Sequence, residues 1–112
     1  MITDLPNADR AFVAPEKLGG YLLNPDHPAG GPKWRFLERF GFRLDQPNTL
    51  ASALLGHARG NSVSTQISTL HGEKFEIDGP LVCPDGRLPL VRTMWIIGYG
   101  QDSPRFVSMK PI

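Results

Sequence analysis

The chain has 112 residues and a mass of 12.4 kDa, which is the size of one domain with one core. Its 12 Lys and Arg against 11 Asp and Glu give a formal net charge of +1. The molecule as a whole is therefore not a strongly basic nucleic-acid binder, and any polyanion site must be a local cluster. The 12 glycines and 11 prolines predict short elements joined by many turns.

Several classes of protein are excluded by simpler features. The single cysteine, Cys83, excludes an internal disulfide framework and a cysteine-based zinc cluster within one chain. The first residues lack the apolar stretch of a signal peptide, and no apolar run reaches the roughly 18 residues that a membrane span needs. We therefore expect a cytoplasmic protein without a membrane segment, a bound metal or another cofactor.

The front half of the chain has helical periodicity. Residues 1–14 are predicted to be extended, and helices are predicted over Pro15–Leu23, Pro32–Phe40 and Pro47–Arg59. Each range begins with proline, which is favoured at the first helical position, and the second ends before Gly41, a natural helix cap. The aromatic residues near the second helix are assigned to the core rather than to a base-stacking platform: Trp34, Phe36, Phe40 and Phe42.

After Asn61 the period of the apolar residues changes from 3.6 to 2, which indicates strands. Strands are predicted over 62–68, 74–78, 88–97 and 104–110, with turns at His71-Gly72 and Asp85-Gly86. The third is apolar on both faces and is expected inside the sheet. The predicted fold is a single α+β domain over residues 1–112, with about three N-terminal helices packed on a four-stranded antiparallel sheet.

Polar residues interrupt the last two strands. Side chains alternate along a strand, so Arg92 and Thr93 point to opposite faces, and strict alternation groups Arg105 with Met109 but Ser108 with Lys110. If these strands pair, one face presents two or three cations beside Ser108 or Thr93. Such a face suits phosphate binding and the stabilisation of charge during phosphoryl transfer, although strand arginines are also common as ion pairs or solvated edges.

His57 is the histidine with the most informative position. It follows Leu50 by seven residues and Leu54 by three, which places it on the apolar stripe of the third predicted helix, where the helix meets the sheet. A neutral imidazole there could act as general base or acid, or it could be a core histidine bonded to a backbone carbonyl. His27 and His71 are expected at the surface and lack metal-ligand spacing.

Four segments resemble one uncharacterised bacterial family, a domain of unknown function. They are HPxGxxK from His27 to Lys33, HAR from His57 to Arg59, PDGRxxxVRTxW from Pro84 to Trp95, and a Pro-Arg pair near the end. The resemblance covers almost the whole chain. Members of that family occur as small free-standing proteins and as C-terminal modules of larger bacterial toxins.

The order of helices and strands is also similar to the fold shared by barnase, the EndoU nucleases, colicin-type tRNases and RelE-type mRNA interferases. This second resemblance implies a metal-independent ribonuclease in which the 2′-hydroxyl attacks the neighbouring phosphate. It implies His57 as general base or acid, Arg92 and Arg105 as phosphate clamps, and Thr93 or Ser108 as a phosphate ligand. The cations assigned to substrate binding are Lys33, Lys74 and Lys110.

Two functions follow as hypotheses. The first is a toxin-type endoribonuclease of a toxin–antitoxin or polymorphic toxin system, with RNA as substrate and a small neutralising protein as partner. The second is a non-catalytic binding module, such as an immunity protein, an antitoxin or an adaptor, in which the arginines are interface residues. The near-neutral charge favours the second hypothesis. A nucleotide-handling enzyme ranks below both because no nucleotide-binding motif is present.

Overall fold

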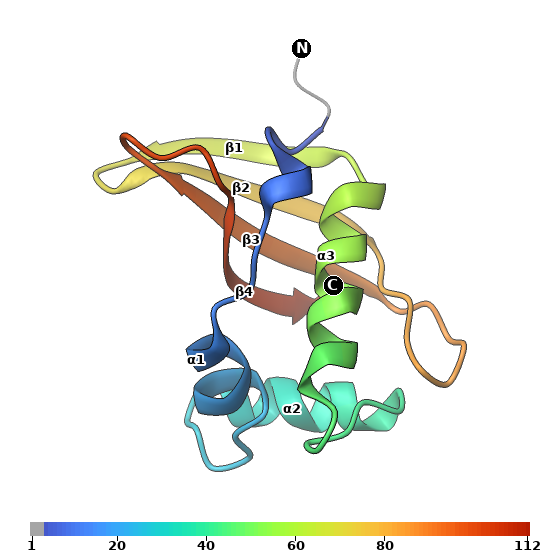
Figure 1. Ribbon diagram of the computed structural model, residues 1–112. Helices are drawn as coiled ribbons and strands as arrows, with labels where there is room; N and C mark the ends of the chain where they lie inside the picture. The colour runs from blue at the N-terminus through green and yellow to red at the C-terminus, as the bar shows by residue number, and fades with distance from the viewer. Residues whose placement is uncertain (1–3) are drawn as a thin grey trace.

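The computed structural model describes residues 4–112, in which short helices precede one sheet (Figure 1). The helical segments are the 3₁₀ turn η1 (Ala8–Arg10), α1 (Pro15–Lys17), the π-helical turn η2 (Leu18–Leu22), α2 (Gly30–Arg39) and α3 (Pro47–Gly60). The strands are β1 (Val63–Thr69), β2 (Gly72–Pro80), β3 (Leu90–Gly98) and β4 (Arg105–Pro111). The α+β class and the antiparallel sheet are confirmed.

The boundaries of the first two helices differ from the prediction. The first helix changes from α to π geometry at Leu18, just before Gly19 and Gly20, which both disfavour a regular α-helix. The second begins at Gly30 rather than Pro32, because the side chain of His27 supplies its cap. Residues 4–14 also include the turn η1, whereas residues 1–3 of the predicted extended segment lie outside the described residues.

The sheet has the strand order β1-β2-β3-β4, so β3 is an interior strand as predicted. Helix α3 crosses one face of the sheet, which we call the core face (Figure 1). The buried side chains of α3 are Leu50, Leu54, His57 and Ala58. The strands bury their own large side chains against this layer: Phe75, Ile77, Val91, Trp95, Phe106 and Met109. In residues 4–112 no helix is long and apolar enough to span a membrane.

A β-bulge in β4 changes which side chains share a face. Trp95 pairs with Phe106 and Met94 pairs with Ser108, so Val107 is an extra residue between the two pairs. As a result Phe106 and Met109 both lie on the core face and are fully buried. The prediction from strict alternation, which grouped Arg105 with Met109, was wrong: Arg105 is on the opposite face.

The opposite face of the sheet, which we call the outer face, carries the polar residues. None of its side chains is fully buried. By register they are Lys74, Glu76 and Asp78 on β2, Arg92, Met94 and Ile96 on β3, and Arg105, Ser108 and Lys110 on β4. The two layers of the molecule therefore leave one surface of the sheet accessible to a ligand.

Candidate functional site

The imidazole of His57 is held inside the molecule by hydrogen bonds to both ring nitrogens. Its Nδ1 lies 2.9 Å from Oγ1 of Thr93, which also accepts a 2.8 Å hydrogen bond from Nε1 of Trp95. Its Nε2 lies 3.1 Å from the carbonyl oxygen of Gly79 and 3.2 Å from that of Val91. The proton is therefore on Nε2, because carbonyl oxygens only accept, and the Thr93 hydroxyl donates to Nδ1.

This environment keeps His57 neutral and joins α3 to the sheet. The His57 residue is 3% exposed, and burial lowers its pKa, while the carbonyl oxygens of Gly79 and Val91 oppose that shift. A general base must reach the proton that it removes, but this imidazole offers no nitrogen to a substrate. His57 and Thr93 are both buried on the core face, whereas Arg92, Arg105, Ser108, Lys74 and Lys110 lie on the outer face.

Arg92, Ser108 and Lys110 lie together on the outer face. Lys110 pairs in register with Arg92, and Ser108 pairs with Met94, two residues further along the same two strands. Arg92 forms a bidentate ion pair with Asp78, with Nε–Oδ1 and Nη2–Oδ2 distances of 2.7 and 3.0 Å. The Arg92 guanidinium lowers the pKa of Asp78, and Lys110 contributes to the same shift. The ion pair fixes the orientation of the guanidinium at the surface.

The hydroxyl of Tyr21 joins the helical layer to this face. Tyr21 in η2 is half-buried, and its hydroxyl lies 2.8 Å from Oγ of Ser108. The Nζ atoms of Lys17 and Lys33 are 5.3 and 6.0 Å from the centre of the Tyr21 ring. Lys33 also donates a 2.8 Å hydrogen bond to the carbonyl oxygen of Met109. Two cations and two hydroxyls therefore meet at the edge of β4.

The HPxGxxK segment positions Tyr21. The Nδ1 atom of His27 accepts hydrogen bonds from the backbone N–H groups of Ala29 and Gly30, at 3.0 and 2.9 Å, and so caps α2. The His27 ring packs edge-on against Tyr21, with 5.1 Å between ring centres. A Cβ at Gly30 would lie 2.0 Å from the carbonyl oxygen of Tyr21, so only glycine allows this approach. The segment thus sets where Tyr21 and Lys33 meet β4.

A carboxylate without an ion-pair partner in residues 4–112 lies on the same face. Glu76 is half-buried and pairs with Met94, whose other partner is Ser108. Two strand spacings separate Glu76 from Ser108, which is about 10 Å between backbones. The hydrogen bonds to Asp78 raise the pKa of Arg92, and the negative charge of Glu76 adds to that shift. In the sequence Glu76 is one of the polar residues that alternate along the predicted strand 74–78, and this pattern is typical of a solvent-exposed surface.

The comparison with protein families identifies the chain. Residues 4–112 match the family model described as "Domain of unknown function (DUF6883)". The protein belongs to the DUF6883 family. The resemblance of the sequence to an uncharacterised domain family is thereby confirmed, and no curated protein matches this DUF6883 chain.

One solved structure similar to the DUF6883 chain is a "contact-dependent growth inhibition toxin - immunity protein complex from Klebsiella pneumoniae 342". The similarity has a TM-score of 0.70 and covers 93% of this chain and 95% of that chain, at 13% sequence identity. At this identity the similarity shows a shared fold.

Two other features of the DUF6883 chain concern its reactive groups. Cys83 is buried, and burial raises the pKa of its thiol to about 11, so the thiolate is rare at neutral pH. Residues 4–112 contain no cluster of three His, Cys, Asp or Glu side chains that could hold a metal ion.

Proposed function

We propose that this DUF6883 protein is a toxin-type, metal-independent endoribonuclease, and that its RNA substrate lies across the outer face of the sheet. The observation that carries the proposal is the hydrogen-bonded pair of hydroxyls, Tyr21 and Ser108, beside the cations Arg92 and Lys110. Hydroxyls and fixed cations at one surface are suited to binding a phosphodiester and to stabilising the charge that develops during its cleavage. The shared fold with a chain of a toxin–immunity complex supports a role in such a system, either as the toxin or as the immunity protein.

The proposed reaction is an attack of the ribose 2′-oxygen on the adjacent phosphorus. The Glu76 carboxylate accepts the proton of the 2′-hydroxyl, and the new bond between the 2′-oxygen and phosphorus displaces the 5′-oxygen of the next nucleotide. The Tyr21 hydroxyl donates a proton to that leaving oxygen. The products are a 2′,3′-cyclic phosphate and a 5′-hydroxyl. Strand β2, which carries Glu76, and strand β4, which carries Ser108, are about 10 Å apart. This separation leaves room for a phosphate between their side chains.

The cations of the outer face have separate roles in this proposal. The Nε and Nη2 groups of Arg92 are bonded to Asp78, which leaves its Nη1 group to donate to a phosphate oxygen. Lys110 lies beside Arg92, while Arg105 and Lys74 extend the binding surface along the neighbouring strands. Lys33 remains a substrate-binding cation at the edge of β4.

His57 and Thr93 hold α3 to the sheet and take no part in the reaction. His27 also acts indirectly, because its Nδ1 is committed to the cap of α2 and its ring supports Tyr21.

We place the activity in the cytoplasm, where RNA is found, and infer a small neutralising protein as partner. The similar solved structure is a complex of a toxin with an immunity protein.

Incubation of the purified full chain with single-stranded RNA in EDTA tests this function. We expect cleavage products that end in a 2′,3′-cyclic phosphate, and a loss of about 10²-fold in rate for Tyr21→Phe and for Ser108→Ala. Circular dichroism of each variant checks that it is folded. Failure of the folded wild-type chain to cleave RNA would end the nuclease proposal.

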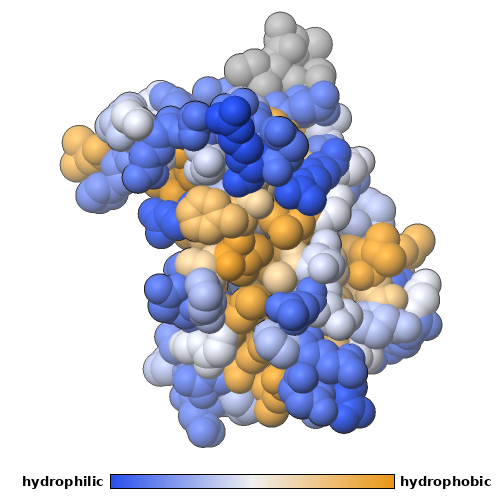
Figure 2. All heavy atoms as spheres, viewed as in Figure 1, coloured by the Kyte–Doolittle hydropathy of each residue, from blue (hydrophilic) through white to orange (hydrophobic). Residues whose placement is uncertain are grey.

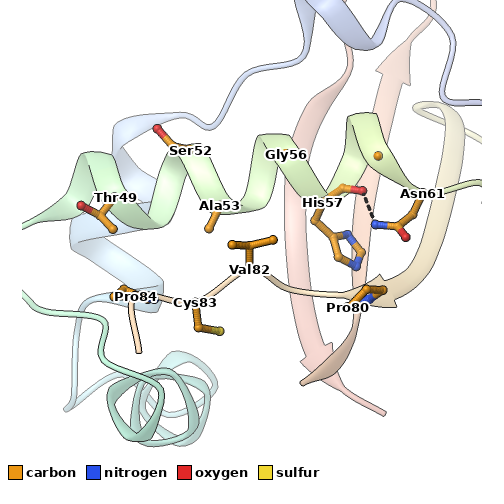
Figure 3. Close-up of a pocket in the computed structure, with 11 residues that line it drawn as sticks. Thr49, Ser52, Ala53, Gly56, His57, Asn61, Pro80, Val82, Cys83 and Pro84 are labelled. Atoms are coloured by element: carbon orange, nitrogen blue, oxygen red, sulfur yellow. Dashed lines mark hydrogen bonds between the residues drawn. The ribbon is translucent and has the colours of Figure 1, made fainter. Parts of the chain in front are cut away.

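A second candidate function, a non-catalytic binding module, is favoured by one apolar surface. A cavity of about 550 Å³ lies between α3 and the segment after β2, and its lining includes Gly56, His57, Pro80 and Val82 (Figure 3). Hydrophobic side chains gather beside α3 over this loop (Figure 2), where Val82 is 69% and Leu88 58% exposed. Harmless overexpression in bacteria, together with a stable complex with a toxin nuclease, would favour this function over the first.

A further inference from the structure

The two edges of the sheet differ in how they are protected. The edge at β4 is covered: the backbone of Phe12 bonds to Pro104 and Phe106, each at 3.0 Å, and Lys33 bonds to the carbonyl oxygen of Met109. The edge at β1 is open. Within residues 4–112 the backbone-to-backbone hydrogen bonds of β1 all go to β2, and the one further bond to its backbone is at its end, where the hydroxyl of Tyr99 donates to the carbonyl oxygen of Thr69 at 2.6 Å. Every second residue of β1 therefore points an N–H and a C=O out of the sheet.

β1 also lacks the residues that usually prevent pairing of an edge strand. Its sequence, VSTQIST, contains no charged residue and no proline. The only irregularity lies between Val63 and Thr65, so Thr65–Thr69 is a regular strand. Ile67 is 44% exposed on the outer face. An uncharged open strand with an exposed branched side chain is suited to accept another strand.

We propose that β1 pairs antiparallel with β1 of a second copy of this chain, with the two-fold axis at Ile67. In this register Ile67 faces Ile67 of the other copy, Gln66 faces Ser68, and Thr65 faces Thr69. The two sheets join into one continuous sheet with a shared outer face. The dimer is independent of the nuclease proposal, because none of the groups assigned to the reaction lies on β1.

A second copy fits this edge better than a charged partner strand does. Two-fold antiparallel pairing sets each residue against a residue of the same segment, and like charges directly opposite would destabilise it. β1 has no charge to oppose, so self-pairing meets no electrostatic barrier. The pairing also covers both copies of Ile67, which would otherwise leave an apolar side chain in water.

Cysteine crosslinking tests both the dimer and its register. Across the proposed axis the two Cα atoms at position 67 are about 5 Å apart, a distance that a disulfide spans. The two copies of Thr65 are about 13 Å apart, because four residues separate them along the strand. We expect Ile67→Cys to form a covalent dimer under mild oxidation and Thr65→Cys, the matched control, to form none. The native Cys83 is buried and is present in both variants.

Sedimentation gives the second measurement. The wild-type chain is expected to approach twice its 12.4 kDa as its concentration rises, while Ile67→Asp stays at 12.4 kDa. The new carboxylate lies opposite Lys74 on β2, which favours folding of the single chain, but it faces its own copy in the dimer. A wild-type mass of 12.4 kDa at millimolar concentration, a dimeric Ile67→Asp, or equal crosslinking of the two cysteine variants would overturn the proposal.

Discussion

The hydroxyls of Tyr21 and Ser108 lie 2.8 Å apart, although the two residues are 87 positions apart in the chain. Tyr21 is carried by the π-helical turn η2, and Ser108 follows the bulge at Val107 in β4. Without the bulge, Ser108 would share a face with Phe106, which is fully buried. The contact therefore depends on one extra residue in a strand and on the loop that holds Tyr21 in place.

The close approach of Gly30 to Tyr21 predicts a selective effect of an added methyl group. Gly30→Ala places a Cβ 2.0 Å from the carbonyl oxygen of Tyr21, so the backbone must move, at a cost of roughly 1–3 kcal/mol. We expect a lower urea midpoint and slower RNA cleavage. Gly19→Ala is the control, because no atom lies within 4 Å of its new Cβ. Equal midpoints for the two variants would contradict this explanation of the loop.

Removal of a cation from the outer face should weaken RNA binding in a salt-dependent way. Lys110→Gln is expected to lower affinity and to reduce the slope of log K against log salt by about 0.7, the value for one contact to a single strand. Arg43→Gln serves as control, because Arg43 is paired with Asp45 near α3 and is not on the sheet. Binding measured by fluorescence anisotropy at several salt concentrations checks the prediction. An unchanged slope would place the RNA elsewhere.

The hydrogen bonds of His57 predict a large effect on stability. His57→Ala removes the donor to Gly79 and Val91 and leaves a cavity under α3, at a cost of roughly 2–4 kcal/mol. The free energy of unfolding in urea measures this loss. Val63→Ala, at the half-buried start of β1, is a suitable comparison and should cost less. A loss below 1 kcal/mol for His57→Ala, on the same order as a surface change, would be inconsistent with this role.

The lowered pKa of His57 also predicts how stability depends on pH. Burial lowers the pKa below its ordinary value of 6.5, so the unfolded chain binds a proton more readily than the folded chain does. The contribution of His57 to stability is therefore complete above pH 6.5 and is lost as the pH falls below that value. Urea unfolding between pH 8 and pH 5 should show this loss in the wild type and a smaller one in His57→Gln. A steeper pH dependence of stability in His57→Gln than in the wild type would contradict the lowered pKa of His57.

Periodicity predicted most of the fold because most elements have a regular apolar stripe. The stripe of Leu50 and Leu54 located α3 and placed His57 at the helix–sheet boundary. The same pattern gave no information on Thr93 or on the two carbonyls that occupy the imidazole, since those partners come from strands 22 to 36 residues away. Whether a histidine on such a stripe is open or enclosed is decided by tertiary contacts.

The outer face was harder to predict, for two physical reasons. The bulge at Val107 has no signature in the sequence, so alternation failed for Arg105 although it succeeded on β3. Tyr21 lies within the predicted helix Pro15–Leu23, where helical periodicity does not indicate a contact with a strand, and the loop that positions it contains prolines and glycines without a period. Only the HPxGxxK segment signalled that this loop has a defined structure, and its spacing alone did not reveal the contact with β4.

The most direct test of the proposed site compares Glu76→Gln with His57→Gln in single-turnover cleavage of RNA in EDTA, at a temperature where both variants are folded. Loss of the proposed general base should slow cleavage by Glu76→Gln at least about 10²-fold. His57→Gln should cleave at nearly the wild-type rate while unfolding at lower urea. The reverse result, with cleavage lost in His57→Gln and kept in Glu76→Gln, would contradict the location of the site on the outer face.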